Sequence, residues 1–460
     1  MVVMPGRDEP HDASLTALQE VYAGILARAP EHDFAPTLDR VEEVCDLLGH
    51  PQRAYRVVHV AGTNGKTSTS RMIERLVREH GLRTGLFTSP HLTSVTERIE
   101  VDGEPLSAGA FVSAWQDVAP YVHLVDTRSV EAGGPRMSFF EVLTVMAFAA
   151  FADAPVDVAV IEVGMGGTWD ATNVVRPEVA VVTPIAHDHE RWLGHDILDI
   201  AGEKAGVLKE HVTAVVAAQR EEVEGVLLAA AAERGTRVLR EGVDLEVVAR
   251  QVAVGGQLVD LRTPAGLYRE VFVPLHGAHQ AHNALLALGA AEALLSGGTV
   301  PGPVVEAAFA GSTSPGRLEL VRSSPTVLVD AAHNPHGAQA LAEAITEAFA
   351  FERLVGVVAM LADKDAEAIL AALEPVLDEV VVTRTSSDRA LEVEELAAVA
   401  GEVFGPDRVH LAERLDNALA LAVELSEGGV AGSPTGAGVL VTGSVVTAAE
   451  ARLLFGGRRP

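Results

Sequence analysis

Cysteine is almost absent from this sequence of 460 residues, which contains only Cys45. One thiol can form neither a disulfide framework nor a metal site made of several thiolates, so both are excluded. The cysteine falls in the helical pattern of residues 37–48, and we interpret it as a buried structural thiol.

Basic residues are scarce as well: 35 lysines and arginines stand against 64 acidic residues, a net charge of −29. A field of that sign repels nucleic-acid phosphates and anionic membrane surfaces, so neither is expected as a partner. An anionic small substrate would need a local cluster of backbone N–H groups, basic side chains or metal ions.

Long apolar runs are missing too. The most apolar helical stretch, residues 142–152, is bounded by Glu141 and Asp153 and is far shorter than the ~20 residues that cross a bilayer. It is predicted to be a core helix. Residues 1–14 are polar and lack the apolar centre of a signal peptide, so we expect a cytoplasmic protein without a membrane anchor.

The hydrophobic pattern that is present predicts a doubly wound α/β fold. From Tyr55 onward, short runs rich in valine and isoleucine alternate with longer helical patterns, as in a parallel sheet covered by helices on both faces. The predicted strands span residues 55–61, 84–88, 156–163, 179–183 and 212–217, and the predicted helices span 66–80, 139–151, 197–206 and 221–233.

The pattern changes at residues 245–275, where apolar and polar residues alternate and turns are expected at 255–256 and 264–266. This predicts a small antiparallel sheet, followed by a helix over 280–295. The small, polar segment 311–316 is the best candidate for a linker.

A second α/β series follows the linker and predicts an independent Rossmann-like domain. Because one core rarely keeps growing beyond ~250–300 residues, we expect two domains, 1–312 and 313–460. The strands of the second series are predicted at residues 326–329, 354–359, 379–383 and 439–442, and its helices at 335–349, 366–377, 393–403 and 415–426.

A glycine-containing loop lies between the first predicted strand and helix. The backbone N–H groups of such a loop, with the N-terminus of the helix, can hold a triphosphate. Lys66 would reach the outer phosphates, and Thr67 would offer its hydroxyl to the accompanying magnesium ion. Val60 stands where the general pattern has a glycine, and a turn that only caps the helix is the alternative. The residues expected to bind ATP here are Gly62, Thr63, Asn64, Gly65, Lys66, Thr67 and Ser68, which makes the first domain a predicted phosphate-loop ATPase.

Polar residues follow three other predicted strands: Ser89, Glu162 and the segment His187-Asp188-His189. The ligand crevice of an open parallel sheet lies beyond the carboxyl ends of its strands, so these residues indicate a magnesium site. Ser89 alone would be better explained as the start of a turn. Glu162 favours function, since a carboxylate that ends so apolar a strand is costly to bury unpaired. Which histidine takes part is left open.

Lys204 has two interpretations. It could be an ordinary cation on a helix surface. Alternatively, a neutral amine near a metal could capture carbon dioxide and become an anionic oxygen ligand.

Eight motifs together resemble one family, the folylpolyglutamate synthases and dihydrofolate synthases, which are relatives of the Mur peptidoglycan ligases. The resemblance runs from about Leu38 to the C-terminus. The motifs are HVAGTNGKTST at 59–69, FTSPHL at 87–92, SFFE at 138–141, EVGMGGTWDATN at 162–173, DH…LG at 188–194, EKAG at 203–206, PGRLE at 315–319 and DAAHNPHG at 330–337.

The resemblance implies a role for each matching residue. Ser89 and Glu162 would bind one magnesium ion, His189 would bind a second, and Lys204 would be the carbamylated lysine of the family. Lys66, Lys204 and His333 would be catalytic. ATP would also contact Asn283, Arg317 and Asp330; the pterin would contact Ser138, Phe139, Phe140, Glu141, Trp169, Asp170 and Ala171; and glutamate would contact His333 and Ser444.

Two segments depart from the family pattern. Thr168-Trp169 replaces the usual Arg-Leu, which could alter the pterin pocket, and residues 445–449 lack the usual aromatic residue. The implied cofactors are ATP and two magnesium ions, with a monovalent cation left open.

By resemblance, the chain is an ATP-dependent ligase that adds L-glutamate to dihydropteroate and to reduced folates through an acyl phosphate. We expect both activities in a monomer. One alternative is a Mur-type ligase for UDP-muramoyl substrates, disfavoured because only ~54 residues precede the first strand, too few for its extra domain. The other is a nucleotide-dependent switch or assembly protein, which needs no second substrate.

Overall fold

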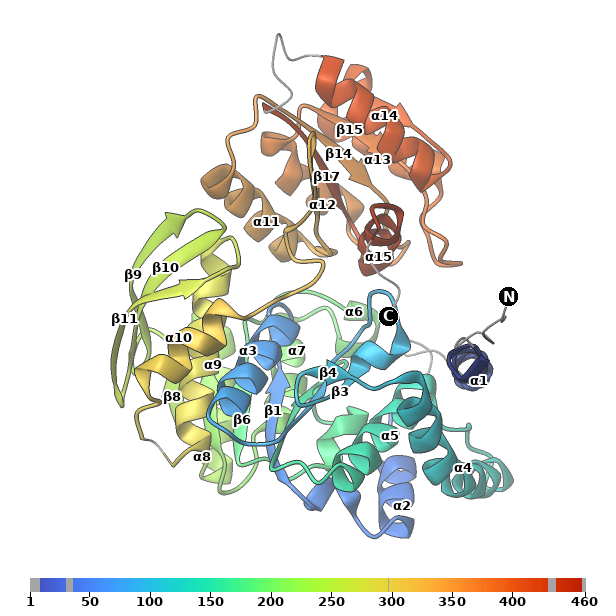
Figure 1. Cartoon of the computed structure of the whole chain (residues 1–460), viewed down its shortest axis with the longest axis vertical. Helices are drawn as coiled ribbons and strands as arrows, with labels where there is room; N and C mark the ends of the chain where they lie inside the picture. The colour runs from blue at the N-terminus through green and yellow to red at the C-terminus, as the bar shows by residue number, and fades with distance from the viewer. Residues whose placement is uncertain (1–8, 30–35, 297, 429–435, 457–460) are drawn as a thin grey trace, which may run out of the picture.

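The computed structural model describes residues 9–29, 36–296, 298–428 and 436–456. They form one eight-stranded, one three-stranded and one six-stranded sheet. Figure 1 shows the six-stranded sheet and its helices above the other two sheets. Most of residues 1–14, on which the expectation of a cytoplasmic protein was based, lie outside the described residues. Within the described ranges, no helix combines the length and the apolar character needed to cross a membrane.

The main sheet is parallel through its middle and ends in an antiparallel edge. Its strand order is β4-β3-β2-β5-β1-β6-β7-β8, so the phosphate-loop strand β1 lies between β5 and β6. The central strands are short and valine-rich because both of their faces are buried. Their bounds are β1 Arg56–Ala61, β2 Thr84–Phe87, β3 Ile99–Val101, β4 Glu104–Pro105, β5 Val158–Glu162, β6 Val179–Val182, β7 Thr213–Val216 and β8 Arg237–Arg240.

Helices cover both faces of this sheet. Helices α3 (Lys66–Glu79), α9 (Ala278–Leu294) and α10 (Gly302–Ala310) share one core with the sheet. On the opposite face lie α1, α2, α4 and α5 at one end, and α7 and α8 at the other. Their bounds are α1 Glu9–Leu26, α2 Asp39–Leu47, α4 Ala108–Glu131, α5 Phe139–Asp153, α7 Ile197–Lys204 and α8 Glu221–Arg234; the single turn α6 covers Glu190–Leu193.

The three-stranded sheet consists of β9 (Glu246–Ala253), β10 (Gly256–Thr263) and β11 (Gly266–Val273). It is antiparallel, with β10 in the middle, and its turns at 254–255 and 264–265 fall within one residue of the predicted positions. Its inner face packs into the same core as α9, so it extends the first body rather than forming a separate one.

The six-stranded sheet has the order β12-β13-β17-β14-β15-β16 and is parallel except for the edge strand β12. Helices α11, α12 and α13 cover one face, and α14 and α15 cover the other. The strands are β12 Glu319–Ser323, β13 Thr326–Val329, β14 Arg353–Val358, β15 Glu379–Val382, β16 Val409–Leu411 and β17 Ala437–Thr442, and the helices are α11 Pro335–Ala348, α12 Ala366–Leu373, α13 Val393–Phe404, α14 Leu415–Gly428 and α15 Val445–Leu454.

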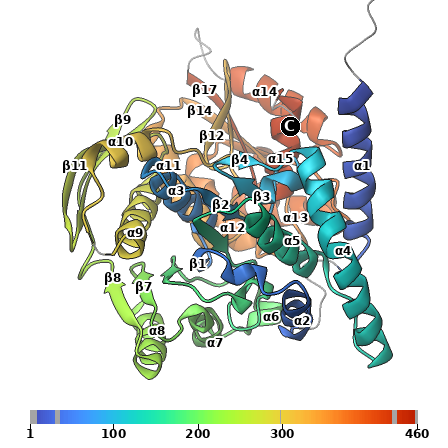
Figure 2. The same cartoon turned by 60° about the horizontal axis from the view of Figure 1, so that its bottom comes forward.

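The predicted fold class is confirmed: two α/β units, the first with an added antiparallel sheet. Helix α10 ends at Ala310 and β12 begins at Glu319, so the segment between them connects the units. Figure 2 shows α1 alongside α4 at one edge of the molecule, where the Arg28 guanidinium pairs with Asp126 at 2.8 Å.

Candidate active site

The phosphate loop lies at the centre of the main sheet, between β1 and α3. Gly62 has a φ of 139°, and a Cβ there would lie 1.9 Å from the Thr183 hydroxyl oxygen, so this position requires glycine. Gly65, with a φ of 87°, turns the chain into α3. The amine of Lys66 folds back and donates to the Thr63 carbonyl at 3.1 Å. The predicted strand, loop and helix are confirmed.

Glu162 ends β5 beside this loop. Its Oε1 accepts a hydrogen bond from the Thr67 hydroxyl at 2.9 Å, and the backbone of Ser89 lies beside the carboxylate. Its Oε2 is buried and has no partner among the described residues. Burial raises the pKa of Glu162 to about 7, against the opposing charge of Lys66.

The residues around Glu162 fit a magnesium ion, because a buried carboxylate oxygen without a protein partner suits a hard cation. The described part of the chain contains no group of three or more His, Cys, Asp or Glu side chains placed to share a metal. A cation here would therefore also need hydroxyl or phosphate oxygens, and the hydroxyl of Thr67 already lies against the carboxylate.

Lys204 is buried at the C-terminal end of α7. Its amine donates a hydrogen bond to the Gly62 carbonyl at 2.9 Å, so the lysine stabilises the conformation of the phosphate loop. Burial lowers the pKa of Lys204 to about 7, and the charge of Lys66 acts in the same direction. A substantial neutral fraction near pH 7 is the form that carbamylation requires.

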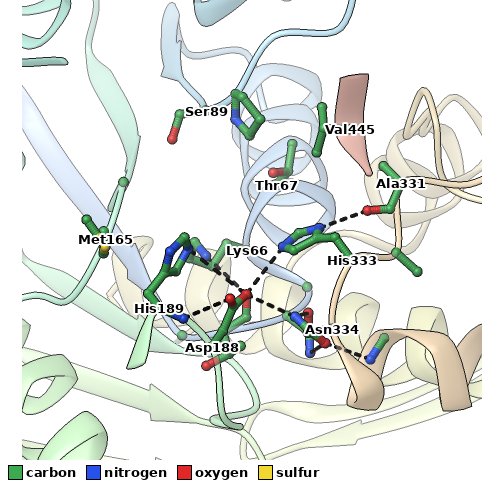
Figure 3. A pocket seen from close by; sticks show the side chains of 18 of the residues that line it. Lys66, Thr67, Ser89, Met165, Asp188, His189, Ala331, His333, Asn334 and Val445 are labelled. Carbon is green, nitrogen blue, oxygen red and sulfur yellow. Dashed lines mark hydrogen bonds and ion pairs between the residues drawn. The ribbon is translucent and has the colours of Figure 1, made fainter. Parts of the chain in front are cut away.

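Asp188 gathers side chains from both units, and Figure 3 shows His189, His333 and Asn334 around its carboxylate. The distances from its oxygens are 2.7 Å to Lys364 Nζ, 3.1 Å to Asn334 Nδ2 and 3.3 Å to His333 Nε2. Burial acts to raise the pKa of Asp188, but the hydrogen bond from His333 and the nearby positive charges hold it well below its ordinary value. The carboxylate is thus ionised and joins the two units.

The two histidines beside Asp188 differ in their surroundings. His189 has a φ of 54°, and its side chain is 40% exposed on the wall of the cleft. Partial desolvation there lowers its pKa, against the opposing charge of Asp188, and a neutral imidazole can bind a metal. The Nδ1 of His333 lies 2.9 Å from the Ala331 carbonyl, which fixes the orientation of the ring. The sequence left open which histidine of residues 187–189 takes part; His189 is the one that lies nearer this cluster.

The residues predicted to contact ATP beyond the loop come from three elements. Asn283 lies on α9 so close to the loop that a Cβ on Gly65 would meet its amide oxygen at 2.5 Å. Asp330 follows β13 and accepts the backbone N–H groups of Leu318 and Ala332, each at 2.7 Å. It therefore holds the segment that carries Arg317 against the end of β13.

The residues predicted to contact the pterin divide by role. Ser138 and Glu141 form the capping box of α5, and Glu141 also pairs with Arg40 at 2.9 Å. Asp170 accepts the Met165 backbone N–H at 2.9 Å and caps the turn that begins at Ala171. The polar members thus build the pocket walls, while the rings of Phe139, Phe140 and Trp169 line its space.

All predicted site residues line one cleft of about 1820 Å³ between the units. Ser444, the N-cap of α15, accepts a hydrogen bond from the Thr447 backbone at 3.0 Å and closes the cleft from the second unit. The roles that the resemblance assigns to these residues stay predictions, whereas their common location is observed.

Several cleft residues were missed by the sequence reasoning. Lys364 follows β14 and Asn334 precedes α11, so the rule that strand ends carry function, applied to the second sheet, would have found both. His91 follows β2 in the segment Ser89-Pro90-His91 and was noticed but given no role, whereas Tyr22 and Arg98 carry no such signal, since they lie on α1 and a short 3₁₀ turn.

Lysine usage adds a signal of its own. The sequence contains four lysines, and three of them, Lys66, Lys204 and Lys364, line this cleft. The fourth, Lys209, donates to the Val175 carbonyl at 2.7 Å. All other basic positions, histidine aside, are filled by arginine. Lysine is therefore nearly confined to the cleft in this chain.

Two family models match the chain. The model described as Mur ligase middle domain matches residues 108–291, and the model described as Mur ligase, glutamate ligase domain matches residues 316–445.

Curated relatives match over most of their length. The dihydrofolate synthase/folylpolyglutamate synthase of Mycobacterium tuberculosis is 51% identical, over 99% of this chain and 96% of its own. The Escherichia coli protein of the same name is 33% identical, over 83% and 85%.

Solved structures agree with these matches. A Mycobacterium tuberculosis folylpolyglutamate synthase in complex with ADP and AMPPCP has a TM-score of 0.93 at 51% identity, covering 97% of this chain and all of that one. An E. coli FolC structure with DHPP and ADP has a TM-score of 0.82 at 30% identity, covering 96% and 98%.

Proposed function

The chain belongs to the dihydrofolate synthase/folylpolyglutamate synthase family of Mur-type glutamate ligases, and from that premise we propose how its cleft performs the reaction. The family activity adds L-glutamate to dihydropteroate and to folates at the expense of ATP. The observation that carries the proposal is the single cleft in which the phosphate loop, an unpartnered carboxylate and an aromatic end meet.

The reaction has two steps. A substrate carboxylate oxygen attacks the γ-phosphorus of ATP, and the bond from this phosphorus to the oxygen that bridges the β- and γ-phosphates breaks. The products of this step are an acyl phosphate and ADP. The amine of L-glutamate then attacks the acyl carbon, an amide forms, phosphate leaves, and the amine loses a proton. Two anions must approach each other in the first step, so local positive charge is essential.

The phosphate loop supplies part of that charge. Its backbone N–H groups and the N-terminus of α3 face the β- and γ-phosphates, and Lys66 moves from the Thr63 carbonyl to the outer phosphates. Asn283, Arg317 and Asp330 surround the rest of the nucleotide, and Arg317 and Asp330 bring it against the second unit.

Metal-binding residues complete the charge balance. Ser89 and Glu162 would hold one magnesium ion, and His189 with carbamylated Lys204 would hold a second, with a monovalent cation as a further candidate. When bound, these ions neutralise phosphate oxygens. Thr67, which contacts Glu162, would share the first ion with the nucleotide.

The substrates occupy the two remaining parts of the cleft. The pterin lies at the aromatic end, against Phe139, Phe140 and Trp169, in a pocket built by Ser138, Glu141, Asp170 and Ala171. L-Glutamate enters from the second unit, where His333 and Ser444 would orient it.

The unit boundary is proposed at residue 312, with an ATP-binding and catalytic domain over 1–312 and a glutamate-ligase domain over 313–460. Closure of the second domain onto the first would keep water from the acyl phosphate. We also propose that the protein acts in the cytoplasm as a monomer.

One assay tests the function. Purified protein is given ATP, magnesium and L-glutamate, with dihydropteroate or tetrahydrofolate in separate tubes, and both ADP and the glutamylated product are quantified. We expect product in both tubes. ADP release in a tube that contains no acceptor would contradict the proposal. The absence of glutamylated product from both acceptor tubes would contradict it as well.

The variant Lys66→Ala tests the phosphate loop. Loss of a positioned cation at the transferred phosphoryl group is expected to lower kcat/KM by at least about 10²-fold. Circular dichroism should show an unchanged fold, since the lysine lies on the loop surface of the cleft. A folded variant with wild-type turnover would sink the loop assignment.

A further inference from the structure

A ring cluster closes the aromatic end of the cleft, and one of its members comes from α1, which precedes every motif on which the family resemblance was based. Tyr22 of α1 lies edge-on to Phe139, with ring centroids 6.2 Å apart, and edge-on to His91, at 5.9 Å. Tyr22, His91 and Phe139 all line the cleft.

The cluster is fixed by polar contacts as well. Arg98 Nε donates to His91 Nδ1 at 2.8 Å, and the Arg98 guanidinium lies 5.1 Å from the centroid of the Phe139 ring. Because Nδ1 accepts this bond, a neutral His91 carries its proton on Nε2, which faces the Tyr22 hydroxyl at 3.4 Å.

The position of α1 is also fixed. The backbone N–H of Phe139 donates to the Ala29 carbonyl at 2.9 Å, and Arg28 bonds to the Met137 carbonyl at 3.1 Å. The segment after α1 is thereby tied to the start of α5. Leu26, on the next turn of α1 after Tyr22, is 55% exposed although it lines the cleft.

The loop Ser89-Pro90-His91 relates this cluster to the reacting groups. Its first residue contacts Glu162 and its third contacts Tyr22. The acid substrate must place its carboxylate at the phosphate loop. The rest of a flat, conjugated acid therefore extends along this loop toward Tyr22 and Phe139, which offer apolar edges and faces to an aromatic ring.

We propose that Tyr22 is a specificity-determining residue that, with His91 and Arg98, forms the outer wall for the pteroyl group of dihydropteroate. The inference rests on the proposed function and adds α1 to the substrate site. A folate reacts through a carboxylate of its glutamate, so its pteroyl group lies one glutamate farther from the phosphate loop and is not held by this wall.

Steady-state kinetics of Tyr22→Ala, Tyr22→Phe and the control Glu20→Ala, whose side chain is exposed on the same helix, test the wall. For Tyr22→Ala we expect KM for dihydropteroate to rise by about tenfold, equivalent to about 1.4 kcal/mol, and KM for tetrahydrofolate to change by less than about threefold. KM for ATP and for glutamate should stay within about twofold, as expected for a residue that contacts only the acid substrate. Tyr22→Phe retains the ring and should change each KM by less than about threefold.

Three results would overturn the inference: an unchanged KM for dihydropteroate in Tyr22→Ala, an equal rise in the KM of every substrate, or a rise confined to tetrahydrofolate. The second would mark a structural role and the third a contact with the tail. If Tyr22→Ala does not fold, Tyr22→Leu is judged by the same criteria. Failure of the wild-type protein to glutamylate either acceptor would instead defeat the proposed function.

Discussion

Glu162 and Lys204 are buried ionisable residues, and each has a pKa of about 7. Burial causes both shifts, because it disfavours the charged carboxylate and the charged amine alike. Buried polar atoms are normally hydrogen-bonded, whereas Glu162 Oε2 is not. The fold therefore carries a local cost at this position, which is the pattern expected where a ligand completes the site.

Replacement of Glu162 by glutamine should separate stability from function. The neutral amide removes the desolvation cost of a buried carboxylate, so the free energy of unfolding in EDTA should rise by about 1–3 kcal/mol. Turnover should fall by at least about 10²-fold, because the proposed cation loses its carboxylate. Urea unfolding and the ADP-release assay measure the two effects.

The control for this variant is Glu210→Gln, whose side chain is exposed. It should leave both quantities within error. A Glu162→Gln protein that is less stable than the wild type and equally active would mean that the carboxylate is structural.

His59 gives a prediction about pH. It lies fully buried on β1, its Nε2 is 2.8 Å from the Thr172 hydroxyl, and burial, aided by the charge of Lys209, lowers its pKa to about 3. The folded protein keeps this ring neutral, whereas the unfolded chain protonates it below about pH 6.5. The stability that His59 contributes is therefore present above pH 6.5 and is lost as pH falls toward 3.

The variant His59→Gln lacks this titration. Between pH 6.5 and pH 5 the wild type should lose about 2 kcal/mol relative to the variant, since each pH unit in this window is worth about 1.4 kcal/mol. Chemical unfolding of both proteins at the two pH values gives the difference. A constant difference would show that the ring is already protonated, or is exposed, in the folded state.

At the scale of single residues, the sequence predicted site residues best where a charged side chain occurs in an apolar segment. Glu162 was identified because a carboxylate ends an apolar strand. Asp188 was noticed but given no role, since its partners Lys364, Asn334 and His333 lie 145–176 positions away and only the fold brings them together.

At the scale of elements, the phosphate loop and the N-terminus of α11 are joined by a pair of amides. Asn64 Nδ2 donates to Asn334 Oδ1 at 3.1 Å, and Asn334 Nδ2 donates to Asn64 Oδ1 at 3.0 Å. Asn334 is also the N-cap of α11, where it accepts the Gly337 backbone N–H at 2.8 Å. The phosphate loop is therefore hydrogen-bonded directly to the second unit.

A double-mutant cycle of Asn64→Ala and Asn334→Ala measures this connection. We expect the two effects on kcat/KM for glutamate to fall short of additivity by about 1 kcal/mol, the size of one or two hydrogen bonds. Gln339→Ala, exposed on α11, serves as the control. Full additivity would show that the amide pair is not maintained during turnover.

The predicted elements agree with the observed ones wherever the strand is buried on both faces. The ends of β1, β2, β5, β6 and β7 differ from the predictions by one or two residues. The edge strands β4, β8, β12 and β16 were missed because they are short and partly exposed, and β3, next to the edge, was missed because it has only three residues, so none carries a continuous apolar run. Helix α4 was missed as well: its 24 residues include Pro120 and only a sparse buried stripe.

For the whole molecule, the topology rule accounts for half of the site. Parallel strands place their carboxyl ends at one edge, which predicts that the loop, Ser89, Glu162 and His189 meet. No such rule says how the second unit faces the first. The places of Arg317, Asp330, His333 and Ser444 in the cleft followed only from the resemblance, and α1 had no prediction at all.

The distribution of lysine has a consequence for chemical labelling. Apart from the α-amino group, the four lysines are the only primary amines of the chain, and three of them line the cleft. An amine-selective reagent should therefore act as a probe of cleft occupancy, because few other sites on the chain can react with it. Peptide mass spectrometry should find Lys66 protected by a non-hydrolysable ATP analogue with magnesium, while Lys209 modification is unchanged. Equal labelling of Lys66 with and without the nucleotide would place ATP elsewhere.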